Sequence, residues 1–136
     1  MASRTRLYLA IALGGALGSL ARHLCALAGL ALLGPGFPWG TLGVNVAGSF
    51  LIGLYATLTQ PQGRIVATPA MRQGVMAGFC GGFTTFSVFS LESIRLLGAG
   101  HGGLAAGYVL VSAATWLAAV WLGHRLAQRM NRRRAA

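Results

Sequence analysis

The sequence predicts an all-α membrane protein with four transmembrane helices, and composition and apolar segment length are the observations that predict it. Of the 136 residues, 55% are hydrophobic and only 9% are charged, whereas a water-soluble domain carries about 25% charged residues. A bilayer core about 30 Å thick requires about 20 mostly apolar residues per helix, and four such stretches follow one another along the chain. We therefore expect one domain over residues 1–136, without an extramembrane domain.

Short segments rich in glycine, proline and polar residues separate the four stretches. The segment from Gly34 to Pro38 contains two glycines and two prolines, which predicts a turn. The first stretch follows two arginines, as a signal peptide would, but its length and the three later stretches predict a retained helix. We expect spans over residues 7–33, 39–59, 71–97 and 104–126, followed by a basic tail over residues 127–136.

The net charge of +10 comes entirely from arginine. The arginines do not form a stripe on a folded domain, so the sequence does not predict nucleic-acid binding. Four passes place the N-terminus, the segment between spans two and three and the C-terminus on one side. That side has nine arginines and the other side only two, Arg22 and Arg95. This imbalance is the positive-inside pattern of membrane proteins.

The third span contains a glycine-rich string, Gly78-Phe-Cys-Gly-Gly-Phe-Thr-Thr85, at the expected centre of the membrane. Glycine costs about 1 kcal/mol relative to alanine at a helical position, so the cluster is compatible with a helix that breaks in mid-membrane. A break would free carbonyl groups that protein, water or an ion must satisfy. The alternative is an unbroken helix with a glycine-lined packing groove.

Polar residues recur at helical spacing on two other spans. The stripe on span two consists of Thr41, Asn45 and Ser49. The stripe on span four consists of Tyr108, Ser112 and Thr115. On span three, Phe86 and Phe89 lie at i and i+3 with Ser87 and Ser90 beside them. Because intramembrane polar residues tend to mark pathways, the stripes predict either a narrow polar conduit or a polar seam between helices.

The chemistry of the stripes favours an anion as the solute. They contain no carboxylate, whereas cation pores carry acidic rings or carbonyl arrays. Hydroxyl groups and an amide can donate hydrogen bonds, and phenyl edges carry the positive end of the ring quadrupole. Arg22 either adds positive potential at a pore mouth or extends its head group to the membrane surface.

Little in the sequence points to an enzyme. No nucleophile, base and orienting group come together, and the three histidines lie at span ends. Cys25 and Cys80 lie within apolar segments without metal-ligand spacing, so we expect them to be packing residues.

Two strings carry a resemblance to a known family: Gly40-Thr-Leu-Gly-Val-Asn-Val-Ala-Gly-Ser49 and Gly78-Phe-Cys-Gly-Gly-Phe-Thr-Thr-Phe-Ser-Val-Phe-Ser-Leu-Glu92. The chain resembles the Fluc fluoride channels, also called the CrcB family, over all four spans. The segment Gly14 to Arg22 is similar to the family's first helix.

The resemblance implies an antiparallel, dual-topology dimer in a bacterial inner membrane that exports fluoride passively. It implies a structural sodium ion held by backbone carbonyls of Gly81 and Thr84 from both subunits. Phe86 and Phe89 would present ring edges to fluoride. The remaining pathway residues would be Asn45 near the entrance, Thr41, Tyr108 and Ser112 in the hydroxyl track, Ser87 beside the phenylalanine pair, and Arg22 of the first helix.

Some features depart from the resemblance or stay open. Phe83 and Val88 differ from commoner family residues, and Glu92 matches an acidic position to which we assign no role. The arginine imbalance also permits a heterodimer with an oppositely oriented paralogue instead of a homodimer. Two other functions compete: a small multidrug transporter, which requires a carboxylate in the first helix that this chain lacks, and a non-transporting assembly subunit.

Overall fold

The protein is described by a computed structural model that covers residues 2–135, with side chains described for residues 3–132. Among these residues, four helical passes are long and apolar enough to cross a membrane. The third pass is divided into several elements, and the others are single helices. In chain order the elements are α1 (Ala2–Leu33), α2 (Trp39–Leu58), α3 (Pro69–Gln73), the π-helix η1 (Gly74–Cys80), α4 (Gly81–Phe83), α5 (Phe86–Gly98) and α6 (Gly102–Ala135).

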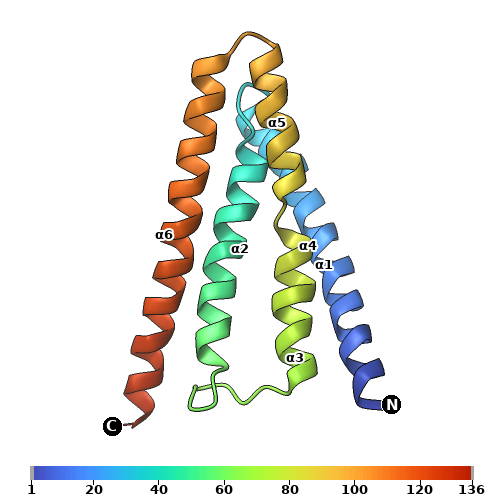
Figure 1. The fold of residues 1–136 in the computed structure, drawn as a ribbon, viewed down its shortest axis with the longest axis vertical. Coiled ribbons are helices and arrows are strands. Elements are labelled where there is room, and N and C mark those ends of the chain that lie inside the picture. The colour runs from blue at the N-terminus through green and yellow to red at the C-terminus, as the bar shows by residue number, and fades with distance from the viewer. Residues whose placement is uncertain (1, 136) are drawn as a thin grey trace.

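The four passes run up and down, so that the start of α1, the connection between α2 and α3 and the end of α6 lie at the same end of the molecule (Figure 1). This confirms the side on which most arginines were expected. Gly34 and Gly100 follow α1 and α5 with positive φ angles of 77° and 80°, a conformation that glycine adopts without steric cost. The predicted turn between Gly34 and Pro38 therefore forms as expected.

Helix α2 is the most buried of the four passes. Its buried residues recur at helical spacing and include two threonines and an asparagine: Thr41, Val44, Asn45, Gly48, Gly53, Thr57 and Leu58. One polar stripe predicted from the sequence therefore faces protein. The other long helices leave most of their apolar side chains uncovered; Leu13, Leu17 and Leu20 of α1 are each more than half exposed. An apolar surface of this extent is stable in contact with lipid and not in contact with water.

Glycines allow α1 to lie directly against the third pass. A Cβ atom added at Gly14 would lie 2.2 Å from the carbonyl oxygen of Gly74, and one at Gly18 would lie 2.2 Å from that of Phe79. From the opposite helix, a Cβ at Gly82 would lie 2.4 Å from the carbonyl oxygen of Gly15. The two backbones are therefore closer than any side chain would permit, as expected from four-residue glycine spacing.

The structure differs from two expectations at α6. Gly103 and Gly107 have the four-residue spacing that predicts a packing pair, but a Cβ at either position meets no atom within 4 Å, so neither glycine packs against another of the described helices. The fourth span was expected over residues 104–126 with a separate basic tail over residues 127–136, and α6 instead continues through this tail to Ala135. Its 34 residues extend about 51 Å, which exceeds the thickness of a bilayer core. The basic end of α6 therefore extends beyond the bilayer core and is still helical.

The packing of α1 makes a prediction for stability. Gly18→Ala should lower the free energy of unfolding by about 1–3 kcal/mol, because the added methyl group must displace backbone and not a flexible side chain. Unfolding by sodium dodecyl sulfate in mixed micelles measures this change. Gly107→Ala is the matched control, since its methyl group meets open space and alanine favours helix. Equal stability of the two variants would contradict the proposed close packing.

Candidate functional site

The third pass is interrupted at Thr84 and Thr85, and Asn45 of α2 binds the interruption. Both threonines have extended backbone, with ψ angles of 161° and 124°. The Asn45 Nδ2 group donates to the Thr85 carbonyl oxygen at 2.9 Å, and the Thr85 N–H donates to Asn45 Oδ1 at 2.7 Å. Asn45 is only 4% exposed. One amide side chain therefore satisfies both main-chain groups of an extended residue, which would otherwise lack partners in lipid.

The interruption also redirects the donors that would normally bind two carbonyl groups. In a continuous helix the Thr85 N–H would bind the Gly81 carbonyl and the Val88 N–H would bind the Thr84 carbonyl. Here the Thr85 N–H binds Asn45, and the Val88 N–H binds Thr85 Oγ1 at 3.2 Å as an N-terminal cap of α5. The oxygens of Gly81 and Thr84 thus lose their usual helical donors.

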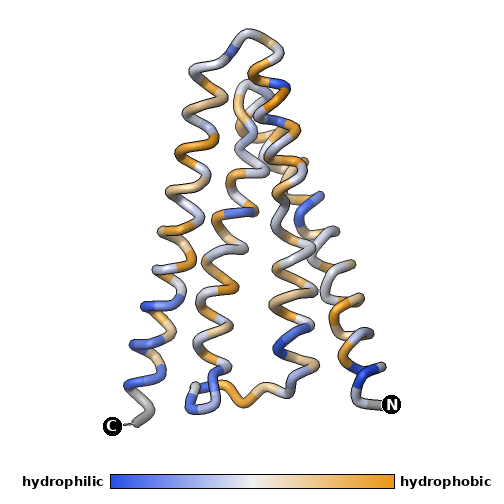
Figure 2. The backbone as a smooth tube through the Cα atoms, in the orientation of Figure 1, coloured by the Kyte–Doolittle hydropathy of each residue, from blue (hydrophilic) through white to orange (hydrophobic). Residues whose placement is uncertain are grey.

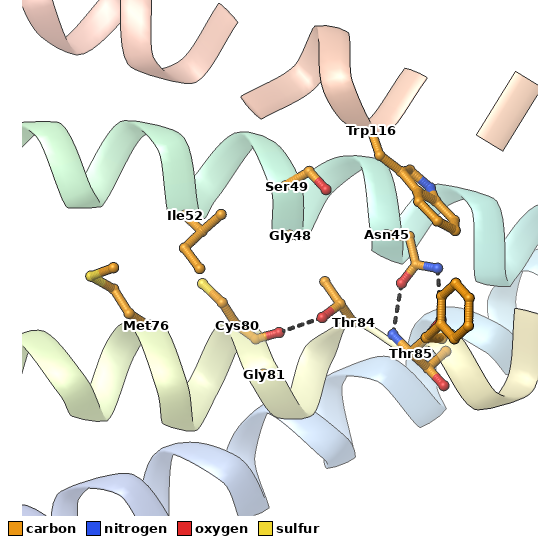
Figure 3. A pocket seen from close by; sticks show the side chains of 11 residues that line it. Asn45, Gly48, Ser49, Ile52, Met76, Cys80, Gly81, Thr84, Thr85 and Trp116 are labelled. Atoms are coloured by element: carbon orange, nitrogen blue, oxygen red, sulfur yellow. Dashed lines mark hydrogen bonds between the residues drawn. The ribbon is translucent and has the colours of Figure 1, made fainter. Parts of the chain in front are cut away.

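These residues line a pocket of about 280 Å³ between α2 and the third pass (Figure 3). Asn45 and Ser49 point toward it from α2, and Thr84 and Thr85 approach from the other side. Trp116 of α6 also lines the pocket, and its Nε1 atom is buried without a hydrogen-bond partner within the described residues. The pocket is open on one face because Gly81 is exposed and Phe86 is 71% exposed.

Arg22 lies apart from the other predicted pathway residues. Its Nε atom donates to the Gly82 carbonyl oxygen at 3.1 Å, so it reaches the third pass from α1, one residue after Gly81. The guanidinium supports the main chain of the interrupted segment from α1. The contact joins Arg22 to the third pass and does not extend it toward the membrane surface; the other interpretation, positive potential at a pore mouth, stays a prediction.

The aromatic pair predicted from the sequence is part of a longer row of rings. The centroids of Phe86 and Phe89 are 5.6 Å apart, and Phe89 lies 5.1 Å from Tyr108 and 4.9 Å from Trp116. Phe89 is 7% exposed and Tyr108 is fully buried. The Phe89 and Trp116 rings meet edge to face at 72°, the geometry that ring quadrupoles favour, and the other two pairs are tilted at 50° and 56°.

At the end of this row, Glu92 binds two of the predicted hydroxyl groups. Thr41 Oγ1 donates to one carboxylate oxygen at 2.8 Å, and the Tyr108 hydroxyl donates to the other at 2.9 Å. The carboxylate also lines a second pocket of about 480 Å³ that includes Arg95. No role for Glu92 follows from the sequence pattern. The signal that could have identified it is the cost of a carboxylate within a membrane span, which marks functional positions.

The two remaining polar residues, Ser112 and Ser87, differ in burial and in their hydrogen bonds. Ser112 lies one helical turn beyond Tyr108, is fully buried, and has no hydrogen-bond partner for its Oγ atom within the described residues. Ser87 is exposed and lies 3.3 Å from Thr85 Oγ1, so it belongs to the cap of α5. Among the predicted pathway residues, Phe86, Phe89, Tyr108 and Thr41 are joined by ring contacts and by the Glu92 carboxylate, and Asn45 lines the same pocket as Phe86.

The contacts of Asn45 predict its effect on stability. Asn45→Leu should cost about 2–4 kcal/mol of unfolding free energy, because it leaves the buried N–H and carbonyl of Thr85 unpaired. Unfolding in mixed micelles again provides the measurement. Ser49→Ala is the control, since it removes a polar group one turn along the same helix that binds neither Thr85 group. An Asn45→Leu protein as stable as the wild type would show that the interruption does not depend on this amide.

Comparison with known proteins identifies the family. Residues 9–124 match the family model described as CrcB-like protein, Camphor Resistance (CrcB). The chain is 54% identical over 129 residues to the fluoride-specific ion channel FluC 1 of Rhodopseudomonas palustris, an alignment that covers 95% of this chain and 92% of that protein. It is 55% identical over 127 residues to the fluoride-specific ion channel FluC of Opitutus terrae, with coverage of 92% and 95%. The four apolar passes, the residues matched and these identities lead to one conclusion: the chain is a multi-pass membrane protein and belongs to the CrcB-like family.

Proposed function

We propose that this protein is a fluoride-selective channel that lets fluoride leave a bacterial cell through the inner membrane. Its relatives are named fluoride-specific ion channels, which agrees with the expectation that the chain is not an enzyme. The observation that carries the proposal is the row of contacts from Phe86 through Phe89 and Tyr108 to Glu92 and Thr41, with Asn45 lining the same pocket as Phe86. This row combines ring edges with hydroxyl and amide groups, and these are chemical groups that can replace the water around a small anion.

The chemistry of fluoride makes passive export sufficient. Hydrogen fluoride is a neutral weak acid that crosses membranes and ionises inside the cell. A membrane potential of 100 mV drives one anionic charge outward with about 2.3 kcal/mol. A pore that binds fluoride closely and excludes larger anions by its width therefore needs no energy-coupling site.

Glu92 and Ser112 refine the proposed route. Because Glu92 accepts the hydrogen bonds of both Thr41 and Tyr108, fluoride can bind those hydroxyl groups only by replacing the carboxylate as their acceptor. The buried Ser112 hydroxyl has no competing partner within the described residues. We infer that fluoride passes from the Phe89 edge to Ser112 and then to the hydroxyl groups of Thr41 and Tyr108 as the Glu92 carboxylate moves aside.

The function is tested by fluoride efflux from liposomes that contain only this chain. Fluoride should leave down its gradient while chloride is retained. Phe86→Ile and Phe89→Ile should each lower fluoride flux at least tenfold, because isoleucine has similar apolar bulk but no positive ring edge. A fluoride electrode and a chloride electrode measure the two fluxes.

Phe79→Ile is the control for these substitutions, since Phe79 stacks on Phe83 and does not line the pocket of Asn45. Equal fluoride and chloride fluxes would contradict selectivity. The absence of flux from folded protein would favour the non-transporting assembly subunit, and proton-coupled cation movement would favour the multidrug transporter. Wild-type flux in a folded Asn45→Asp protein would remove Asn45 from the pathway, since aspartate presents only acceptors to an anion.

We also propose a structural sodium ion between two copies of the chain. The Gly81 and Thr84 carbonyls are suited to hold it, because their usual helical donors bind elsewhere and both residues line the open pocket. Two oxygens are too few to replace the water around a cation. The same two oxygens from a second, antiparallel copy would complete the site and cover the exposed Phe86 ring. The ion would supply positive charge that stabilises the facing carbonyls.

The sodium proposal predicts that the dimer depends on the ion. Exchange of sodium for N-methylglucamine should lower the thermal unfolding temperature of the dimer, and returning sodium should restore it, because ligand binding to the folded state stabilises that state. Returning choline is the control for ionic strength. An unfolding temperature that is unchanged after complete removal of sodium would argue against the site.

The arginine distribution bears on how such a dimer forms. Nine arginines lie at the end that holds both termini and two lie elsewhere, which favours one orientation. An antiparallel homodimer needs both orientations. Without the five arginines after Leu122 the count is four against two, and the first helices usually dominate insertion. We therefore propose dual insertion and a homodimer, with an oppositely oriented paralogue as the alternative partner.

Dual insertion predicts that a reporter fused to the C-terminus is detected on both sides of the membrane. The measurement uses cells that express this chain alone, with labelling before and after permeabilisation. A single-topology membrane protein carrying the same reporter is the control. A signal only from the cytoplasm, with no antiparallel dimer recovered, would require a partner chain.

A further inference from the structure

The outer surface between α2 and α6 contains an apolar groove that the proposed channel does not use. It has a volume of about 720 Å³ and is lined along α2 from Trp39 to Leu51 and by Ala119 and Leu122 of α6. No lining side chain carries a charge. At 1.5 Å per residue, the α2 segment extends about 18 Å, which is comparable with a lipid acyl chain.

Two arginines continue the same helix face beyond the groove. Arg125 and Arg129 follow Leu122 at i+3 and i+7, so they lie one and two turns further toward the end of α6. Both are exposed, and the Arg125 guanidinium lies 5.1 Å from the Trp121 ring centroid. Figure 2 shows the change along α6 from apolar to strongly polar residues at this level. The face thus changes from apolar at Leu122 to cationic at Arg125 and Arg129, with the Trp121 ring beside Arg125.

The chain cannot neutralise these charges with its own acidic side chains. Glu92 is its only acidic residue, and its two oxygens accept hydrogen bonds from Thr41 and Tyr108. These partners lie near the beginnings of α2 and α6, whereas the two arginines lie toward the end of α6. Arg125 and Arg129 therefore have no acidic side chain of their own chain as a partner and are available to an anionic group of another molecule.

Hydrogen bonds fix the helix that carries the two arginines. The His124 Nδ1 atom lies 2.7 Å from Thr57 Oγ1, and Asn131 Nδ2 donates to the Thr57 carbonyl at 3.0 Å. The Arg64 N–H donates to Asn131 Oδ1 at 2.9 Å. These bonds join the end of α6 to the end of α2 and to the following loop. The cations are consequently held in place beside the groove and do not belong to a free tail.

We propose that this surface binds an anionic phospholipid, with one acyl chain in the groove and the phosphate between Arg125 and Arg129. Guanidinium groups bind phosphate oxygens through paired hydrogen bonds, and tryptophan favours the level of lipid head groups. A soluble phosphate would use the arginines but leave the apolar groove empty. The combination of groove and cations therefore matches a lipid, and it is independent of what the channel conducts.

Native mass spectrometry of the full-length protein tests the charge component, with phosphatidylglycerol and phosphatidylcholine of identical acyl chains. Wild-type protein should prefer phosphatidylglycerol. The double substitution Arg125→Gln/Arg129→Gln should weaken its binding about thirtyfold, as expected for two arginines near an anionic head group. Arg4→Gln/Arg6→Gln is the matched control, since it removes two exposed arginines from the same end of the molecule. An equal loss in both variants, or no preference in the wild type, would overturn the proposal.

Filling the groove tests the apolar component. Gly43 lines the groove, and a Cβ atom added there meets nothing within 4 Å, so Gly43→Leu should fold and occupy the space of the acyl chain. It should weaken phosphatidylglycerol binding without changing the size of the oligomer. Displacement of the lipid by an equal concentration of inorganic phosphate would reduce the surface to a phosphate site and overturn the lipid assignment. Disruption of the oligomer by Gly43→Leu would show that a second copy covers the groove and would likewise overturn it.

Discussion

The paired hydrogen bonds between Asn45 and Thr85 are the interaction on which the rest of the site depends. A helix in lipid cannot leave main-chain groups unpaired, and Thr84 and Thr85 are both extended. The Asn45 amide supplies a donor and an acceptor at 2.9 Å and 2.7 Å, which is what one extended residue requires. No single hydroxyl group at position 45 could reach both Thr85 groups in the same way. The irregular backbone is thus stable because the Asn45 side chain from α2 replaces main-chain hydrogen bonds that a continuous helix would form.

This replacement has consequences on both sides of the third pass. On the pocket side, Gly81 and Thr84 line the pocket and their carbonyl groups lose their helical donors, which is the basis of the proposed sodium site. On the side of α1, the Arg22 guanidinium binds the neighbouring Gly82 carbonyl. The close packing of α1 through Gly14 and Gly18 brings these helices together. The glycines therefore serve the site indirectly, because they bring the two main chains into contact.

Glu92 gives the proposed pathway its second constraint. A carboxylate on an anion route is unfavourable unless its charge is compensated, and here two hydroxyl groups bind it. The same hydroxyl groups are the donors proposed for fluoride. The carboxylate and the anion consequently compete for Thr41 and Tyr108, so the position of Glu92 would control whether the route is open. The unpaired Ser112 hydroxyl, one turn away on α6, lies outside this competition.

The sequence by itself determined the class of the protein and the helical faces that carry polar residues. Length and apolar content predicted four passes because each apolar stretch is long enough to cross a bilayer as a helix that satisfies its own main-chain hydrogen bonds, and the turn at Gly34 to Pro38 formed as its composition predicted. The stripe of Thr41 and Asn45 on α2 faces protein, as its spacing predicted.

Only the tertiary structure decided which groups are partners. Spacing along a helix fixes a face but not what another helix places opposite it. The sequence therefore could not pair Asn45 with Thr85, Arg22 with Gly82 or Glu92 with Tyr108, whose partners are 40, 60 and 16 residues apart. The helical continuation of the basic tail was also missed, because the bonds of Asn131 to Thr57 and Arg64 that hold it there join residues distant in the chain. The local sequence pattern determines which side chains lie on each face of a helix, and packing between helices determines which of these side chains form hydrogen bonds.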